Sequence, residues 1–167
     1  LQLINNHSDR ERLLRIINVP ARKIGDRTLD CIALLAEEQG TDMFGIIENA
    51  TKYPILSRSC GALLGFASLI NSLTELSENL PLDRFVTEVI ERSGYRQMLI
   101  DGGEPEKERL ENLEEFISGV LEYQNRDENP TLTGFLEENA LVADVDKYDE
   151  NADAVVMMTV HSAKGLE

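Results

Sequence analysis

Two stretches of the sequence carry polar and basic side chains at spacings that suit the binding of anions. The first runs from Asn18 to Asp30, NVPARKIGDRTLD, where a short turn containing a glycine joins two segments with helical apolar patterns. Amide groups at the start of a helix lack intrahelical acceptors, and together with the helix dipole they attract phosphate. Arg22, Lys23 and Arg27 would surround such a start. The stretch therefore predicts a clamp on a nucleic-acid backbone that fixes position without reading bases.

An ordinary helical hairpin with a basic surface is the alternative interpretation of this stretch, and the pattern alone favours it. Asp26 follows the glycine and is expected to cap the second helix. At that position its carboxylate would oppose a bound phosphate, because the two groups carry the same charge.

The second stretch is TVHSAKGLE, from Thr159 to Glu167, which follows a continuous apolar run. Loops that leave the carboxyl end of a parallel strand bind ligands in α/β proteins, so His161, Ser162 and Lys164 would project into a cleft. His161 could donate to a phosphate, Lys164 could pair with an anion, and Glu167 could accept from a sugar hydroxyl. The sequence contains no Gly-rich phosphate loop, nucleophile elbow or metal-spaced pair of carboxylates, so we expect no complete catalytic or metal centre. A polar loop without a ligand is the alternative.

Charge is distributed unevenly along the chain. The formal net charge is -15, but the segment from Arg10 to Thr28 holds six basic and two acidic residues, which leaves -19 for the rest. Phosphate binding is driven by Lys and Arg side chains that release counterions. A local basic face on an acidic body indicates a protein that touches a polyanion at one place and is repelled elsewhere. A solvated basic helix face without a partner fits the charge equally well.

The elements that must position these stretches are mostly helices. Apolar residues recur at spacings of three and four, with capping residues before them and Gly or Pro after them. Ser8 or Asp9 is expected to cap the first helix, and Gly40 and Gly94 to end the second and fifth. The expected helices lie at about 8–18, 26–40, 42–50, 57–79, 81–94, 104–124 and from 131 onward.

The pattern changes near the carboxyl end. Residues 145–151 are polar and acidic, as in a linker, and residues 154–160 form a β-branched and Met-rich apolar run, typical of a strand buried on both faces. Such a strand has no partner within this chain. We therefore expect a mainly α fold in which residues 1–150 form a helical module, while residues 151–167 belong to a sheet formed elsewhere in a longer protein.

Composition indicates a reducing, aqueous compartment. Cys31 and Cys60 are the two cysteines, and they lack the spacing of a metal site or a disulfide framework. No run of about 18 apolar residues is present, and no charged leader followed by an apolar segment opens the chain. We expect a cytoplasmic protein without a membrane partner.

Several segments together resemble one family. The stretch RIINVPARKIGDRTL is similar to the segment that opens the 2B subdomain of UvrD, Rep and PcrA-type superfamily 1 DNA helicases, and VVMMTVHSAKGLE is similar to their motif V. The segments RSGYRQML, RLENLEEFISGV and PTLTGFLEENALVADVD resemble later helices of that subdomain, in the same order. The resemblance covers nearly the whole chain.

The resemblance implies a parent DNA helicase that hydrolyses ATP with Mg2+ and moves 3'-to-5' on single-stranded DNA in repair or replication. Its helical 2B subdomain would be inserted into the RecA-like motor domain 2A, with hinges near residues 3–6 and 148–153, and would contact the duplex and gate activity by rotating. The Walker A loop, the acidic Mg2+-binding motif and the arginine fingers are not among these residues, so this chain alone is expected to be inactive. The expected partners are DNA at a single-strand/duplex junction and repair or replication proteins.

The resemblance also implies roles for individual residues. In motif V, Thr159 and His161 match positions that lie against single-stranded DNA, whereas Gly165 and Glu167 match positions near the bound nucleotide; Lys164 matches less well. The helical hairpin resembles a helix-hairpin-helix-like duplex contact, for which the expected residues are Arg22, Lys23, Ile24, Gly25, Arg27 and Thr28. The family usually has GIG at this turn. Here Lys23 replaces the first glycine, which adds a charge and removes backbone freedom.

Two functions from different classes remain open. The module is either a duplex-contacting, regulatory subdomain of a DNA helicase, or an acidic helical scaffold that docks a basic protein partner without touching DNA. A related version of the first function places the chain in a nuclease-fused helicase of the AddA or RecB kind. Duplex binding that weakens steeply with salt would favour the first function over the second.

Overall fold

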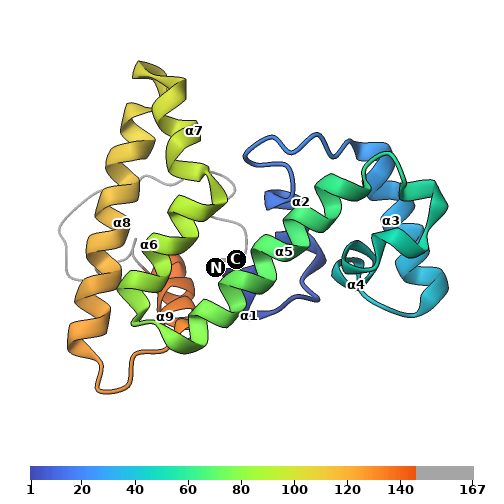
Figure 1. Cartoon of the computed structure of the whole chain (residues 1–167). Helices are drawn as coiled ribbons and strands as arrows, with labels where there is room; N and C mark the ends of the chain where they lie inside the picture. Colours follow the sequence, from blue (N-terminus) through green and yellow to red (C-terminus); the bar gives the residue numbers. More distant parts are fainter. Residues whose placement is uncertain (146–167) are drawn as a thin grey trace, which may run out of the picture.

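The computed structural model describes residues 1–145, which fold into helices joined by short turns (Figure 1). In chain order the α-helices and the 3-10 helices (η) are α1 Gln2–Asn5, α2 Arg10–Ile16, α3 Asp26–Gln39, α4 Met43–Glu48, η1 Ala50–Lys52, η2 Pro54–Leu56, α5 Cys60–Asn79, α6 Leu82–Ser93, α7 Tyr95–Gly102, η3 Glu104–Glu106, α8 Lys107–Arg126 and α9 Leu132–Val145. The mainly α fold predicted from the sequence is confirmed for these residues. The strand predicted at 154–160 lies outside the described part of the chain.

Two hydrophobic clusters hold the helices together. The first includes Leu13, Ile17, Ile24, Ile32, Phe44, Ile47, Leu63 and Phe66, and the second includes Leu73, Leu82, Phe85, Val86, Ile90, Val120 and Phe135. The helices form two groups, α2 to α4 and α6 to α9, and α5 runs from one group to the other (Figure 1). α5 supplies side chains to both clusters. α1 does the same with adjacent residues, because Leu3 belongs to the first cluster and Ile4 to the second. The hairpin of α2 and α3 therefore rests on the first cluster.

The helix ends follow the predicted capping residues with one exception. The Asp9 carboxylate accepts from the Arg12 amide at 3.0 Å and caps α2, and Gly40 ends α3 in the left-handed conformation at φ 63°, as predicted. The predicted cap at Asp26 is wrong. Gly25 is the N-cap of α3, and Asp26 is the first residue within the helix. A carboxylate in the first turn still stabilises the positive end of the helix dipole, which explains an aspartate there without a capping bond.

The sequence pattern does not predict helix α7. Gly94 ends α6 at φ 77°, as predicted, and its amide donates to the Glu91 carbonyl. The same glycine is also the N-cap of α7, so the chain turns and resumes a helix at once. The predicted loop at Gly102 and Gly103 is the end of this helix, since α7 runs to Gly102 and Gly103 is its C-cap.

Replacing Asp42 with alanine is expected to lower the free energy of unfolding by about 1–2 kcal/mol, because its carboxylate both caps α4 and bonds the segment that precedes α2. Asp42 accepts from the Gly45 amide at 2.7 Å, which caps α4, and from the Ser8 hydroxyl at 2.7 Å. Chemical denaturation measures the change. Glu37→Ala, on the exposed surface of α3, is the matched control and should stay within about 0.5 kcal/mol of wild type. Equal effects of the two variants would contradict the capping role.

Candidate nucleic-acid interface

The turn between α2 and α3 is held by the side chain of Asn18. Its Oδ1 atom accepts from the Arg22 amide at 2.7 Å and from the Ile24 amide at 3.4 Å. The Ile24 side chain is buried in the first hydrophobic cluster. Lys23 lies between these two anchored residues, and its side chain is exposed to solvent. The turn thus presents a lysine outward from a fixed backbone.

Lys23 adopts the left-handed backbone conformation, with φ 60°. The resemblance noted in the sequence implies a glycine at this position. Lys23 therefore has a backbone conformation that costs roughly 1–2 kcal/mol for a residue with a Cβ atom.

Lys23→Gly is expected to be more stable than Lys23→Ala by about 0.5–1 kcal/mol, because glycine removes the strain at this φ while alanine keeps it. The gain is smaller than the strain, since glycine also has more conformational freedom in the unfolded chain. Both variants remove the same charge, so the alanine variant is the matched control. Thermal and chemical denaturation measure the difference. An alanine variant as stable as the glycine variant would mean that residue 23 does not hold a positive φ in solution.

The start of α3 faces open space. The amides of Thr28 and Leu29 donate to the Gly25 carbonyl at 2.9 and 3.3 Å, so the first intrahelical bonds begin there and the preceding amides, at Asp26 and Arg27, point out of the helix end. A Cβ atom added at Gly25 would meet nothing within 4 Å. Apart from its chain neighbours Ile24 and Asp26, the Gly25 backbone is therefore not covered at the point where a side chain would begin.

Two cations flank this open helix start. The side chains of Lys23 and Arg27 are exposed, and among the described residues no ion pair within 4.0 Å engages either of them. Asp26 is also exposed beside them, which reduces the local positive charge. Arg15 is less available, because it pairs with Glu11 at 2.8 Å on α2.

The other residues predicted at the duplex contact face the protein. The Ile24 side chain is 1% exposed, and the Thr28 hydroxyl lies 3.2 Å from the Ser59 hydroxyl at the start of α5. The structure thus brings Lys23, Gly25 and Arg27 together at the surface. Ile24 and Thr28 instead attach the hairpin to the first cluster and to α5.

Arg22 also points inward. Its guanidinium donates to backbone carbonyls at the end of α2 and in the following turn, at Ile16 (3.1 Å), Ile17 (3.4 Å) and Pro20 (3.1 Å), and to the carbonyl of Ser93 at the end of α6 (3.1 Å). The guanidinium carbon lies 5.5 Å from the centre of the Phe66 ring. Burial lowers the pKa of Arg22 from its ordinary value, which is the expected effect of removing a cation from water. The Arg22 side chain thus faces backbone carbonyls of the protein, and its predicted contact with DNA stays a prediction.

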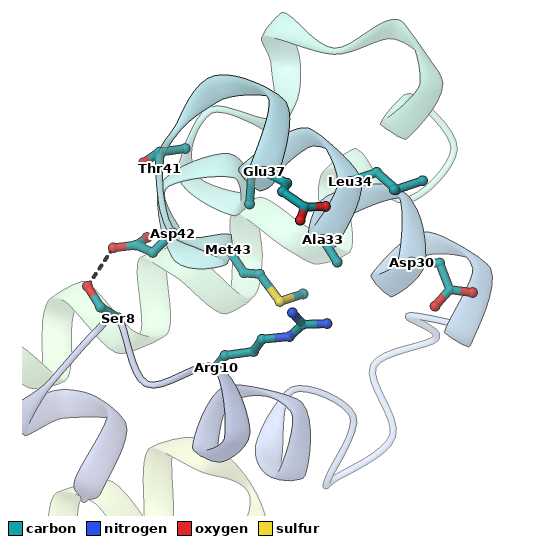
Figure 2. Close-up of a pocket in the computed structure, with 10 residues that line it drawn as sticks. Ser8, Arg10, Asp30, Ala33, Leu34, Glu37, Thr41, Asp42 and Met43 are labelled. Carbon is teal, nitrogen blue, oxygen red and sulfur yellow. Dashed lines mark hydrogen bonds between the residues drawn. The ribbon is translucent and has the colours of Figure 1, made fainter.

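A second surface feature, a groove beside the hairpin, was not predicted from the sequence. It has a volume of 510 Å³ and is lined by Ser8, Arg10, Asp30, Ala33, Leu34, Ala36, Glu37, Thr41, Asp42 and Met43. Figure 2 shows the Arg10 and Met43 side chains extending into it, with Asp30 at one end and the Ser8 to Asp42 hydrogen bond at the other. The residues come from three helices, α2, α3 and α4, and from the segments that precede α2 and α4, so no single spacing in the sequence indicates the groove.

The motif V residues cannot be placed in this geometry. Thr159, His161, Gly165 and Glu167, predicted to contact single-stranded DNA or the nucleotide, lie outside the described residues, as does Lys164. Within 1–145, no group of three or more His, Cys, Asp or Glu side chains is arranged to hold a metal ion. No helix in this range has the length and apolar character needed to cross a bilayer.

The described residues thus form a helical module that carries exposed basic side chains at the start of α3. Residues 1–167 match the family described as the UvrD-like helicase C-terminal domain, and the chain belongs to this family.

Curated relatives of the chain are helicases. It is 33% identical over 174 residues to the ATP-dependent DNA helicase PcrA of Bacillus subtilis (strain 168), and 40% identical over 172 residues to DNA helicase II of Haemophilus influenzae. It is 37% identical over 170 residues to the ATP-dependent DNA helicase PcrA of Staphylococcus aureus (strain Mu50). Each alignment covers all of this chain but only 23–24% of the relative, so the chain spans about a quarter of the length of these proteins.

Proposed function

We propose that this chain is the duplex-contacting, regulatory 2B subdomain of an ATP-dependent DNA helicase. The observation that carries the proposal is the surface formed by Lys23, Gly25 and Arg27 at the start of α3, which we call the hairpin surface. Membership of the UvrD-like helicase family supports DNA as the polyanion for which this surface is built.

The chemistry of the hairpin surface suits a phosphate group of a DNA backbone. Free amides at the start of α3 can donate to phosphate oxygens, and the helix dipole adds a partial positive charge at the same point. Lys23 and Arg27 add two mobile cations whose neutralisation of phosphates releases counterions. Contacts of this kind depend on backbone charge and shape, so we expect binding without sequence preference.

The parent protein in this proposal is a helicase that hydrolyses ATP with Mg2+ and moves 3'-to-5' in repair or replication in the cytoplasm. Residues 1–150 form its 2B subdomain, and residues 151–167 return to motor domain 2A with motif V. In that motif Thr159 and His161 contact single-stranded DNA, and Gly165 and Glu167 lie near the nucleotide. The chain alone binds DNA without hydrolysing ATP, because the parent's other motor motifs supply the catalytic groups.

Fluorescence anisotropy with labelled DNA tests the proposal on the 167-residue chain. A tailed duplex and a blunt duplex should bind more tightly than a single strand of equal length. The logarithm of the binding constant should fall linearly with the logarithm of the salt concentration, with a slope of about -2 to -3 for two to three phosphate contacts. Absence of duplex binding at about 50 mM salt, or a preference for the single strand, would contradict the proposal.

A protein-docking scaffold is the competing function, and the groove in Figure 2 is the observation that favours it. Asp30, Glu37 and Asp42 line this groove against the single cation Arg10, so a basic partner would be attracted to it. Under this alternative, DNA would bind negligibly and substitutions on the hairpin surface would leave partner binding unchanged. The salt titration therefore separates the two functions.

A further inference from the structure

The Arg22 guanidinium joins two parts of the fold that are distant in the sequence. Its Nη1 atom donates to the carbonyls of Ile16, Ile17 and Pro20, whereas its Nη2 atom donates to the carbonyl of Ser93, 71 residues away. Ile16 is the last residue of α2, and Ser93 is the last residue of α6. The carboxyl ends of two helices therefore meet at one cation.

Helix carboxyl ends are suitable partners for a cation that has lost part of its water. The last carbonyls of a helix have no intrahelical donor, and the helix dipole places partial negative charge on them. Among the described residues no carboxylate forms an ion pair with Arg22. The charge is therefore balanced by backbone carbonyls and by the face of the Phe66 ring, and the planar guanidinium reaches the carbonyls of both helix ends while it lies over the ring.

These bonds fix the turn that presents the hairpin surface. The Arg22 amide is held by Asn18, and its side chain ties the carbonyls before the turn to the end of α6. Lys23 follows directly, with its backbone at φ 60°. A backbone in this sparsely populated conformation persists only where the surrounding structure holds it in place. The anchored Arg22 holds the backbone on the N-terminal side of Lys23.

We propose that Arg22 is a positioning residue for the duplex contact: it locks the hairpin turn to α6 so that Lys23 and the start of α3 face the DNA, and it does not bind phosphate itself. The proposal rests on the proposed function for its DNA-binding part. Its structural part, the locking of the turn, stands on the described contacts alone.

Two substitutions at Arg22 and one at Lys23 separate positioning from phosphate binding. Arg22→Gln should weaken tailed-duplex binding several-fold and leave the salt slope at its wild-type value, since no phosphate contact is lost. Lys23→Gln should reduce the magnitude of that slope by about 0.9. Arg22→Lys should weaken binding as Arg22→Gln does, because an ammonium group retains the charge but cannot replace the planar fork. A reduced slope in Arg22→Gln, or wild-type affinity in Arg22→Lys, would overturn the proposal.

A measurement without DNA tests the locking of the turn independently. Amide hydrogen exchange at residues 22 and 24, whose amides donate to the Asn18 side chain, should become faster in Arg22→Lys, while exchange in the centre of α8 stays unchanged. If substitution at Arg22 or Lys23 leaves DNA binding unchanged while amide exchange at the turn becomes faster in Arg22→Lys, the proposed function is contradicted. The role of Arg22 in holding the turn is then still supported. Unchanged amide exchange at the turn would show that Arg22 does not hold the turn, and this conclusion would not depend on the result of the DNA-binding titrations.

Discussion

Charge reversal of Lys23 and Arg27 together is expected to lower the affinity of the chain for a tailed duplex by more than about tenfold at low salt. Each lost phosphate contact removes counterion release worth roughly tenfold at about 50 mM salt, and the new carboxylates add repulsion. The acidic remainder of the chain increases this effect, because the net charge of -15 already opposes DNA everywhere else. Anisotropy titrations of Lys23→Glu/Arg27→Glu against wild type measure the change.

The matched control for charge reversal is Lys107→Glu/Arg109→Glu. It changes one lysine and one arginine by the same charge at the start of α8, where their side chains are 63% and 66% exposed. This site lies in the other group of helices from the α2–α3 hairpin (Figure 1). The control should change affinity only modestly, through net charge. Equal losses in the two variants would mean that binding follows overall charge and that the hairpin surface is not a specific contact.

Leu63→Ala is expected to lower the free energy of unfolding by about 3–4 kcal/mol, which is a large share of the stability of a domain of this size. Leu63 is 0% exposed on α5 and belongs to the first cluster, so its removal leaves a cavity in the core to which α2 and α3 also contribute. Chemical denaturation with circular dichroism measures the loss. The variant should also bind DNA more weakly under conditions in which a fraction of the molecules is unfolded.

Leu34→Ala is the control for the core substitution, because the same atoms are removed from a side chain that is 60% exposed on α3. We expect a change within about 0.5 kcal/mol, since little apolar area is withdrawn from water there. A loss at Leu34 that matched the loss at Leu63 would show that the outer face of α3 is covered in solution. It would also contradict the assignment of the first cluster as the core beneath the hairpin.

Much of the helical fold can be predicted from the spacing of apolar residues and from the residue types at helix ends. Asp9, Gly40 and Gly94 act at helix ends as their types indicate, because capping depends on local backbone chemistry. Apolar periodicity does not indicate helix α7, since a glycine in the left-handed conformation ends one helix and here also starts the next. Whether a chain resumes a helix after such a turn depends on packing against distant elements.

The candidate site, too, could be predicted from the sequence only in part. The types of Lys23, Gly25 and Arg27 indicate anion binding, and the structure places them together at the surface. The direction of the Arg22 side chain could not be predicted from the sequence, because one of its acceptors, the Ser93 carbonyl, lies on an element far away in the chain. An arginine beside a lysine in a basic stretch has the same local pattern whether it faces DNA or a helix end.

The most direct test of the central claim is to map which amides of the chain respond to DNA. Two-dimensional NMR of the 167-residue chain, titrated with a short tailed duplex at low salt, reports each backbone N–H group separately. The account predicts that the largest shift changes occur at the amides of Gly25, Asp26 and Arg27, with smaller changes along the adjoining turn. Largest changes in the groove at Asp30, Glu37 and Asp42, or along α8, would contradict the hairpin surface as the duplex contact.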